Sequence, residues 1–578
     1  MRLLCPRSLV PLSVAAATVV PAFAQGGYSL SVVHVNTPGH PTNVVPGLGV
    51  PFKAGNTTTD GSAAFERPHA SGDGLHFGIN VLAAVGGAVT TSNDDILLVD
   101  GAIAVREGDV CPWPAGAETV GPIDSNFGLN SSGSLLLGNN SSAVSTADDY
   151  VALRVGGVWN VLAKEAVPVS TVVAGLVGDG AGTATWNDTM ESCRLDDVGT
   201  AIWRADLLTG ISTGIANDEI LVIGATALQE GVAVPSGQAG GATNAWDNFD
   251  VEDVFVSPSG FVVAIQGDLL GATTSDDVLV VNGTVVIQEG SILAGSSFTE
   301  PVDQDGIVKA WVDRGDNWYA RGNNDVTEDD WVVRNGIVVA RSDGTDPVLP
   351  GGTEVWSDGV FTDCFFAFDG NHLGHYVIAG VTNAAATSDG VIVFDDGFGN
   401  RHVVVREGEP VDLDDNGLFD DDRFWNTFGN DDVLLLDDGS VIFTATLRTA
   451  AGTVVDQGLF KLVPTLASCT FRNGTGINPI ACSCVTLPVV GTTFQVAVTP
   501  GPQTLGTLLL ADFIPIPPFP IFGGELLIAP APFIVPNNIA IPYGWQGLAF
   551  SLQGVRIDTN GVDLLIVLTN AQDAVVGH

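Results

Sequence analysis

The chain has 578 residues, with 21 Lys and Arg against 66 Asp and Glu, so its formal net charge is −45. Apolar residues make up 45% of the chain and charged residues only 15%. This mixture is too apolar for a disordered protein, while 71 Gly and 31 Pro are too many for long helices. Nucleic acids and anionic membrane surfaces would repel such a chain, so we exclude both as partners.

The first 24 residues are typical of a secretory signal peptide. Arg2 and Arg7 form a short basic start, an apolar stretch follows, and Ala22 and Ala24 supply small residues before a cleavage point at Gln25. We therefore expect an exported protein, either extracellular or on the surface of a bacterial cell. Disulfides are possible in that compartment.

No later segment of the sequence reads as a membrane-spanning helix. The most apolar one, residues 513–543, contains eight prolines, and each proline removes a backbone donor and clashes with the preceding helical turn. We expect no transmembrane segment, and a protein that is either released or held at the surface without a covalent anchor.

The region from residue 25 to residue 463 repeats one unit. In each copy an acidic or polar pair precedes a short apolar strand, a Gly-containing turn and a second apolar strand, often followed by Glu-Gly. A clear copy is "VLVVNGTVVIQEG", which follows Asp276 and Asp277. We number each copy by the second residue of its pair, and the last copy by Asp456, the first of its pair. The copies then start at positions 95, 149, 218, 277, 330, 389 and 456, about 60 residues apart.

Each unit also contains an earlier hairpin with Gly at its bend, as in "VFVSPSGFVVAIQ" at residues 254–266. Two hairpins make a four-stranded antiparallel sheet, and one such sheet cannot bury both of its faces alone. Repetition of these sheets is typical of a β-propeller. The predicted fold is therefore all-β, with a propeller of seven four-stranded blades over residues 25–463 and six or eight blades as alternatives.

The seventh unit lacks a fourth strand, because the sequence changes character after Val463. The mature N-terminus begins with "YSLSVVHV" at residues 28–35, followed by a turn-rich segment that resembles the end of the other units. An N-terminal strand that completes the last blade would fasten the ring and remove a sheet edge. We predict this closure.

The repeated acidic pairs have two interpretations. Asp and Asn before a strand bond nearby backbone amides and suit turns. Alternatively, the pairs form an acidic ring that binds cations or a ligand. We favour the first interpretation.

An acidic loop, "DLDDNGLFDDD", follows the sixth unit. Calcium takes about six to eight oxygen ligands around a tightly curled chain. The spacing D-x-D-x-N-G turns alternate side chains inward, places the bend at a glycine, and leaves a carbonyl and a further aspartate to follow. The predicted ligands of a structural calcium ion are Asp412, Asp414, Asn416, Leu418 and Asp420. A solvated acidic turn is the alternative.

This loop resembles the calcium loops of FG-GAP and integrin-type propellers, and the first half of an EF-hand. It departs from an EF-hand because Arg423 stands at the twelfth position, where a bidentate Glu belongs. The resemblance implies a clamp on the fold rather than a catalytic metal.

Residues 464–578 differ from the repeats in composition. They contain two basic residues, Arg472 and Arg556, and few acids. Short apolar runs in this region predict a β-sandwich of ordinary domain size. We expect Cys469 to form a disulfide with Cys482 or Cys484, because only a short loop separates them.

Two sequence features resemble known families. "CTFRNGTGINPIACSCVTLPVVGTTF" at residues 469–494, with "LTNAQDAVVG" at 568–577, resembles a C-terminal module of large exported planctomycete proteins. The repeats resemble the tandem N-x-x-G propeller-type repeats of uncharacterised bacterial exported proteins. Both resemblances imply export and surface or extracellular placement, and neither implies a catalytic residue.

Two classes of function stay open. An enzyme needs a base, a nucleophile or a paired acid in a pocket, and the G-x-S-x-G match at residues 210–214 lacks the strand-to-helix elbow that it requires. We therefore expect a non-enzymatic propeller that serves ligand binding, adhesion or envelope structure, with a glycan or a surface protein as partner. The alternative is a calcium-stabilised carbohydrate-active enzyme, a hydrolase or a lyase. A cleft with two carboxylates, one of raised pKa, would favour the enzyme.

Overall fold

The computed structural model describes residues 28–577 except 56–62, 114–116, 124–126, 178, 180–181, 188–189, 209–216, 251–252, 294–297, 325–328, 358–362, 417, 491, 530–531, 542–544 and 546. The predicted signal peptide lies outside the described residues. The helical elements that are described are two short 3-10 turns, Val169–Thr171 and Ala239–Gly241. Across the described residues, no helix has the length and apolar character needed to cross a bilayer.

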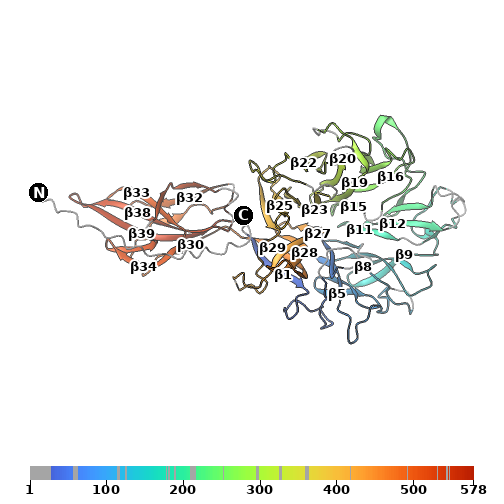
Figure 1. The fold of residues 1–578 in the computed structure, drawn as a ribbon, viewed down its shortest axis with the longest axis horizontal. Coiled ribbons are helices and arrows are strands. Elements are labelled where there is room, and N and C mark those ends of the chain that lie inside the picture. The colour runs from blue at the N-terminus through green and yellow to red at the C-terminus, as the bar shows by residue number, and fades with distance from the viewer. Residues whose placement is uncertain are drawn as a thin grey trace.

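Seven antiparallel sheets, counted over the described residues, follow one another around a ring (Figure 1). Most have four strands in chain order, and the third has a fifth strand because β10 and β11 both pair with β12. The strands of the first six sheets are β2 (Phe65–Ala70), β3 (Phe77–Leu82), β4 (Asp95–Val99), β5 (Ala102–Arg106), β6 (Phe127–Leu129), β7 (Leu135–Asn140), β8 (Asp149–Val155), β9 (Val158–Lys164), β10 (Thr185–Trp186), β11 (Glu191–Leu195), β12 (Ala201–Leu208), β13 (Glu219–Ile223), β14 (Thr226–Gln229), β15 (Val254–Val256), β16 (Val263–Asp268), β17 (Asp277–Val281), β18 (Thr284–Gln288), β19 (Val302–Val312), β20 (Trp318–Asn324), β21 (Trp331–Arg334), β22 (Ile337–Arg341), β23 (Phe365–Gly370), β24 (Tyr376–Val381), β25 (Gly390–Asp395) and β26 (Arg401–Arg406).

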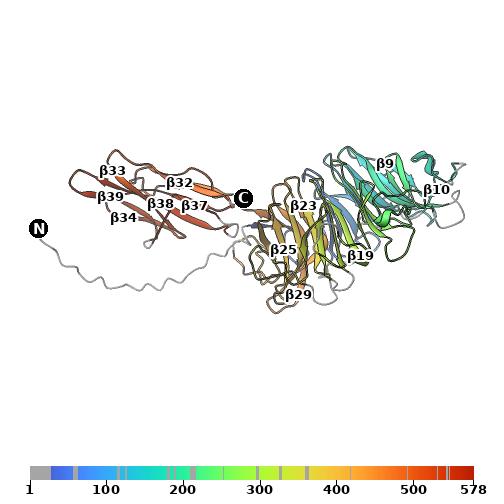
Figure 2. The same cartoon turned by 90° about the horizontal axis from the view of Figure 1, so that it is seen from above.

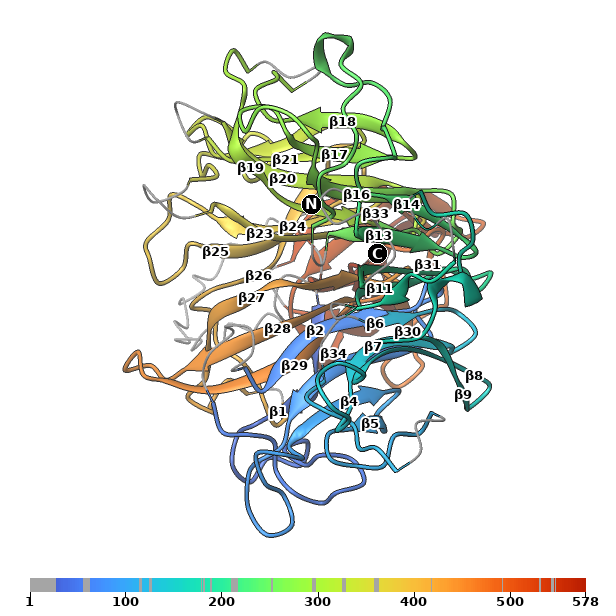
Figure 3. The same ribbon diagram turned by 90° about the vertical axis from the view of Figure 1, so that its right-hand side faces the viewer.

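The seventh sheet joins the two ends of the repeat region. It contains β27 (Phe424–Leu435), β28 (Val441–Arg448), β29 (Val454–Pro464) and the N-terminal β1 (Tyr28–Val35), in the order β1-β29-β28-β27. Tyr28 lies opposite Pro464 and Val35 opposite Gly458, and Figure 3 shows β1 beside β29. The predicted seven blades and the predicted N-terminal closure are both confirmed.

The propeller strands form because β-branched and aliphatic residues pack on both faces of each blade. All five residues of β17 are buried, since a blade lies on either side of this sheet. The hairpins turn at residues that tolerate positive φ: Asn282 at 50° and Gly283 at 78° join β17 to β18. The apolar core is therefore divided among the blade junctions rather than gathered in one place.

Large aromatic side chains fill these junctions. One cluster combines Leu97 of the first blade with Phe127 of the second, and another combines Leu459 of the last blade with Ile96 of the first. Six tryptophans of the described residues are almost completely buried, at 1% exposure or less: Trp186, Trp203, Trp246, Trp331, Trp356 and Trp425. These side chains hold neighbouring blades together and are not available to stack on a ligand.

The chain then forms a second group of sheets, which extends to one side of the ring (Figure 2). The sheet orders are β30-β39-β38-β33-β36, β31-β32-β37 and β34-β35. A shared core includes Phe494, Leu509 and Leu552, as expected for the predicted β-sandwich. The strands are β30 (Ser468–Arg472), β31 (Cys482–Cys484), β32 (Thr493–Val498), β33 (Thr504–Asp512), β34 (Pro515–Ile521), β35 (Gly524–Ile528), β36 (Phe533–Val535), β37 (Asn538–Ala540), β38 (Ala549–Thr559) and β39 (Leu564–Val575).

One disulfide lies in this group of sheets. It joins Cys469 to Cys484, with the two Cα atoms 6.6 Å apart. Cys482 is a buried free thiol, and burial raises its pKa to about 11. The bond ties β30 to β31 at the start of the C-terminal sheets.

Candidate functional site

The acidic loop between β26 and β27 brings three carboxylates together. One oxygen each of Asp412, Asp414 and Asp421 lies within 4.8 Å of the others. Asp421 also accepts the backbone N–H of Leu413 at 2.7 Å, which curls the loop back on itself. This cluster could hold a metal ion, because carboxylate oxygens suit hard cations.

The other predicted ligands lie near this cluster but bond within the loop. The Asn416 side chain donates to Asp414 at 3.0 Å and accepts the N–H of Leu418 at 2.7 Å. Asp420 approaches the Asn416 amide nitrogen at 3.5 Å and is not part of the cluster. A ligand role for Asn416, Leu418 and Asp420 stays a prediction, and Gly417 lies outside the described residues.

Sequence reasoning did not include Asp421. The sequence offers three consecutive aspartates at 420–422 as candidate ligands, and the spacing of the motif favours the first of them, Asp420. The hydrogen bond from Leu413 selects the second aspartate, because that bond turns its side chain toward Asp412 and Asp414.

The loop also contacts the segment that follows the closing strand β1. The His40 ring nitrogen Nε2 lies 3.0 Å from the Leu413 carbonyl oxygen. Arg423, just after the loop, forms an ion pair with Asp456 of β29. A cation in the loop would therefore stiffen the part of the ring where the two chain ends meet.

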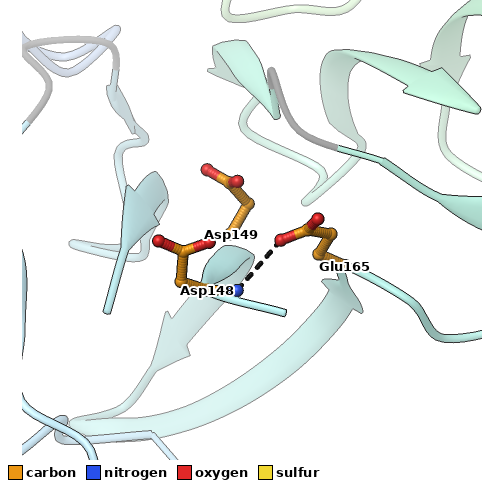
Figure 4. A group of neighbouring side chains, drawn as sticks. All are labelled: Asp148, Asp149 and Glu165. Carbon is orange, nitrogen blue, oxygen red and sulfur yellow. Dashed lines mark hydrogen bonds between the residues drawn. The ribbon is translucent and has the colours of Figure 1, made fainter. Parts of the chain in front are cut away.

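A second acidic cluster lies at the ends of β8 and β9 (Figure 4). Glu165 accepts the backbone N–H of Asp148 through its side chain at 2.9 Å, and its own N–H donates to the Asp149 carbonyl at 3.0 Å. Burial raises the pKa of Glu165. These bonds give the cluster a structural role, since they fasten the fourth strand of the blade to the start of the third.

The same bonds recur in the other blades and correct the alignment of the repeats. The residue after each fourth strand donates its N–H to the carbonyl of a residue at the start of the third strand. The partners in chain order are 95, 149, 219, 277, 330, 390 and 457. The repeat positions 218, 389 and 456 taken from the sequence therefore lie one residue before the bonding residue. With the corrected register, Asp precedes the partner in all seven copies.

At five of the seven corrected positions, namely Asp95, Glu219, Asp277, Asp330 and Gln457, the side chain accepts a backbone N–H of the next blade. Asp95 accepts the N–H of Ile123 at 2.9 Å, and Asp330 accepts that of Cys364 at 2.5 Å. In the last blade, Gln457 accepts the N–H of Ala64 at 2.7 Å. The repeated polar residues thus join neighbouring blades, which agrees with the interpretation that they bond backbone amides.

The centre of the ring is filled by side chains of the seven innermost strands. The His69 ring lies 5.0 Å from the Phe127 ring and 6.0 Å from the Trp311 ring. Trp311 donates to Asp369 at 2.9 Å. A cavity among these described side chains has a volume of about 60 Å³, which admits a few water molecules but no sugar ring.

Cationic side chains gather in this centre although the chain is acidic. Arg314 forms a 3.4 Å ion pair with Asp369. Burial, followed by the charges of Arg194, Arg314 and Arg67, lowers the pKa of His69 to about 3. The imidazole is therefore neutral near pH 7 and is not tuned to act as a general base there.

A larger groove lies on the outside of the ring between the fifth and sixth blades. Its volume is about 540 Å³. All five residues of β22, the edge strand of its sheet, form one wall, and the sixth blade forms the other. The lining residues are Phe298, Ile337, Val338, Val339, Ala340, Arg341, Asp346, Tyr376, Asp395, Gly399 and Arg401.

Two arginines and two aspartates form the polar part of this groove. Arg401 donates to Asp395 at 2.8 Å and to the Val339 carbonyl at 2.6 Å. Asp346 accepts the backbone N–H of Arg341 at 3.1 Å. Burial raises the pKa of Asp346, against the opposing effect of both arginines. The groove is thus lined by hydrogen-bonded donors and acceptors, with as many arginines as aspartates.

No protein-family model matches the chain, and no curated protein matches it in sequence. Solved structures with a partly similar course include a eukaryotic initiation factor, with 9% identity over 70% of this chain and 81% of that chain and a TM-score of 0.28. A subtype N11 neuraminidase-like protein of A/flat-faced bat/Peru/033/2010 (H18N11) shows 10% identity over 77% and 97%, with a TM-score of 0.28. A protein of unknown function from Dyadobacter fermentans DSM 18053 shows 10% identity over 75% and 99%, with a TM-score of 0.26. The assignment as a propeller rests on the sheet order of this chain.

Proposed function

We propose that this protein is an exported, non-enzymatic binding propeller that acts outside the cell or on its surface and carries a structural calcium ion in the loop after β26. The observation that carries the binding role is the filled centre of the ring, where a cavity of about 60 Å³ leaves no room for a substrate on the axis. The signal-type N-terminus and the disulfide between Cys469 and Cys484 support export.

Calcium fits the acidic loop better than a transition metal does, because the clustered ligands are carboxylates without His or Cys. Three carboxylates at one point repel one another, and a divalent cation would relieve that repulsion. Since the loop contacts the segment after β1, calcium would stabilise the closure of the ring rather than create an active site.

Thermal unfolding tests the calcium proposal. We expect calcium to raise the melting temperature of the mature protein by about 5 °C or more over a chelator-treated sample, because a ligand that binds only the folded state stabilises it. Asp414→Asn and Asp421→Asn should lose this rise. Asp420→Asn should keep it, if the ligand set is the one that the structure groups.

Asp415→Asn is the matched control, since Asp415 is an exposed loop residue outside the cluster. It should behave like the parent protein. A parent protein whose melting temperature does not respond to calcium would reduce the loop to a solvated acidic turn. Loss of the response in Asp414→Asn and Asp420→Asn, with the response kept in Asp421→Asn, would restore the ligand set that spacing predicts.

One observation favours the alternative function, a carbohydrate-active enzyme. The outer groove holds two carboxylates, Asp346 and Asp395, and the pKa of Asp346 is raised by burial. Against catalysis, Arg401 is bound to Asp395. Release of reducing sugar from soluble polysaccharides, abolished by Asp346→Asn, would favour the enzyme over the binding protein.

A further inference from the structure

We propose that the groove between β22 and the sixth blade binds a neutral saccharide of one or two rings. This inference rests on the proposed binding role and names its site and ligand class. It depends on four features of the groove: its uncovered edge strand, its capped carbonyl, its charge balance and its mixed walls.

The first feature is the edge strand β22 of the fifth blade, which no described segment covers, whereas the equivalent strand β18 of the fourth blade is covered. In the fourth blade, the Ser236 N–H donates to the Gly283 carbonyl at 2.9 Å, and the Val285 N–H donates to the Ser236 carbonyl at 2.8 Å. A segment of the chain itself thus covers β18. Along β22 no such pairing is present among the described residues, and the strand faces the groove instead.

The second feature excludes an extended peptide as the occupant. Strand addition needs a continuous edge of free N–H and carbonyl groups. The ladder between β21 and β22 shifts register next to Val339, and Arg401 caps the Val339 carbonyl at 2.6 Å. The edge is interrupted at its centre, so the groove suits a small molecule rather than a strand.

The third feature is charge. Among the lining residues Arg341 and Arg401 are balanced by Asp346 and Asp395, and Arg341 also forms a 2.9 Å ion pair with Asp343, so the groove has no excess of positive charge in a chain of net charge −45. The field of the whole protein would repel an anionic ligand. Hydroxyl groups both donate and accept. Asp395 is only 2% exposed and is held by Arg401, so a polyhydroxyl ligand would donate to Asp346 and accept from the arginines.

The fourth feature is the mixed character of the walls. Ile337, which is 67% exposed, and Val338 provide an aliphatic wall, and Phe298 provides an aromatic ring. The C–H faces of a pyranose ring can pack on such surfaces while its hydroxyls reach the polar side. A volume of about 540 Å³ lies within the range of about 300–1,000 Å³ that small-molecule sites occupy.

Titration of the mature protein with maltose, cellobiose and lactose by ligand-observed NMR tests the proposal. We expect at least one of these neutral disaccharides to bind. Ile337→Trp, which fills the groove, should weaken that binding at least tenfold, or about 1.4 kcal/mol. Val158→Trp is the matched control, because Val158 begins the outer strand of the second blade and is 63% exposed. It should bind like the parent.

Three results would overturn the proposal. The folded parent could bind none of the three sugars, Ile337→Trp could bind them as well as the parent does, or the groove could prefer the charged probes glucuronate and arginine over the neutral sugars. The calcium response, measured on the same samples, separates the two proposals. If the protein is stabilised by calcium but binds no sugar, only the groove proposal is refuted. If it binds sugar but is not stabilised by calcium, only the calcium proposal is refuted.

Discussion

Buried carboxyl groups perform an unusual structural task at the residue scale. Asp277 is only 4% exposed and accepts the N–H of Ile307 in the next blade at 3.4 Å. Burial, with the nearby charges of Asp250 and Asp268, raises the pKa of Asp277 to about 8. On folding, the carboxyl group of Asp277 loses its hydrating water and gains a single backbone N–H donor. Its protonated form is therefore favoured in the folded state.

Replacement of this carboxyl by an amide should stabilise the protein in alkaline solution. Between about pH 4 and 8 the unfolded chain releases the Asp277 proton while the folded chain keeps it, so the free energy of unfolding falls as pH rises and levels off above about 8. Asp277→Asn cannot ionise and still accepts the Ile307 N–H. We expect a gain on the order of 2 kcal/mol at pH 8 and little difference near pH 4.

Urea unfolding of Asp277→Asn and its parent at both pH values measures this difference. Asp109→Asn, at an exposed turn residue, serves as the control and should change stability little at either pH. An Asp277→Asn variant that is less stable than the parent at pH 8 would show that the negative charge itself supports the blade contact.

The blade is the unit of the element scale, and single polar residues join one blade to the next. The last junction is made by Gln457, which is fully buried. Its side chain accepts the Ala64 N–H at 2.7 Å and donates to the Phe65 carbonyl at 3.1 Å. Its backbone N–H donates to the Asn36 side chain at 2.8 Å. This one residue therefore connects the closing strand, the last blade and the first.

Removal of this side chain should weaken the closure of the ring. Gln457→Ala leaves a buried N–H and a buried carbonyl of the first blade without partners, which costs on the order of 2–4 kcal/mol. Chemical denaturation of the variant should show that loss, and limited proteolysis should cut first near β1. Gln503→Ala, at an exposed position, should be neutral. An unchanged stability of Gln457→Ala would mean that water or a neighbouring group replaces both bonds.

The acidity of the whole molecule has two parts with different physical origins. Most of the described carboxylates are exposed or half-buried, and the mutual repulsion of those that face solvent is screened by salt. A smaller group is buried at the blades, where burial raises the pKa of Asp95, Asp250 and Glu289 to about 7. For each of these groups, the folded state binds a proton that the unfolded state has already released near neutral pH.

The protein should therefore be more stable in mildly acidic than in alkaline solution. The free energy of unfolding falls as pH rises from the ordinary range of carboxyl groups, near 4, to the raised values near 7. We expect the melting temperature in chelator to be higher at pH 5.5 than at pH 8 by several degrees. Surface repulsion contributes in the same direction, so the scans are repeated at about 1 M salt, where the buried part persists. A pH dependence that vanishes at high salt would assign the effect to the surface.

The candidate site shows where prediction from sequence reached its limit. Asp412 and Asp414 were predicted and lie in the acidic cluster, because they share one short loop whose spacing constrains them. Asp421 was missed, since its place depends on a hydrogen bond to Leu413 across the loop. The groove was not foreseen at all, because Arg401 reaches the Val339 carbonyl from 62 residues away.

The sequence by itself determined the all-β class, the seven blades, the closing N-terminal strand and the C-terminal sandwich. Those features follow from local signals, namely alternating apolar residues, turn residues of positive φ and a repeat whose copies reinforce one another. Only the tertiary structure decided which position of each repeat joins the blades, that the centre is filled, and where a groove remains. These outcomes depend on distances between segments remote in the chain, and local periodicity carries no information about such distances.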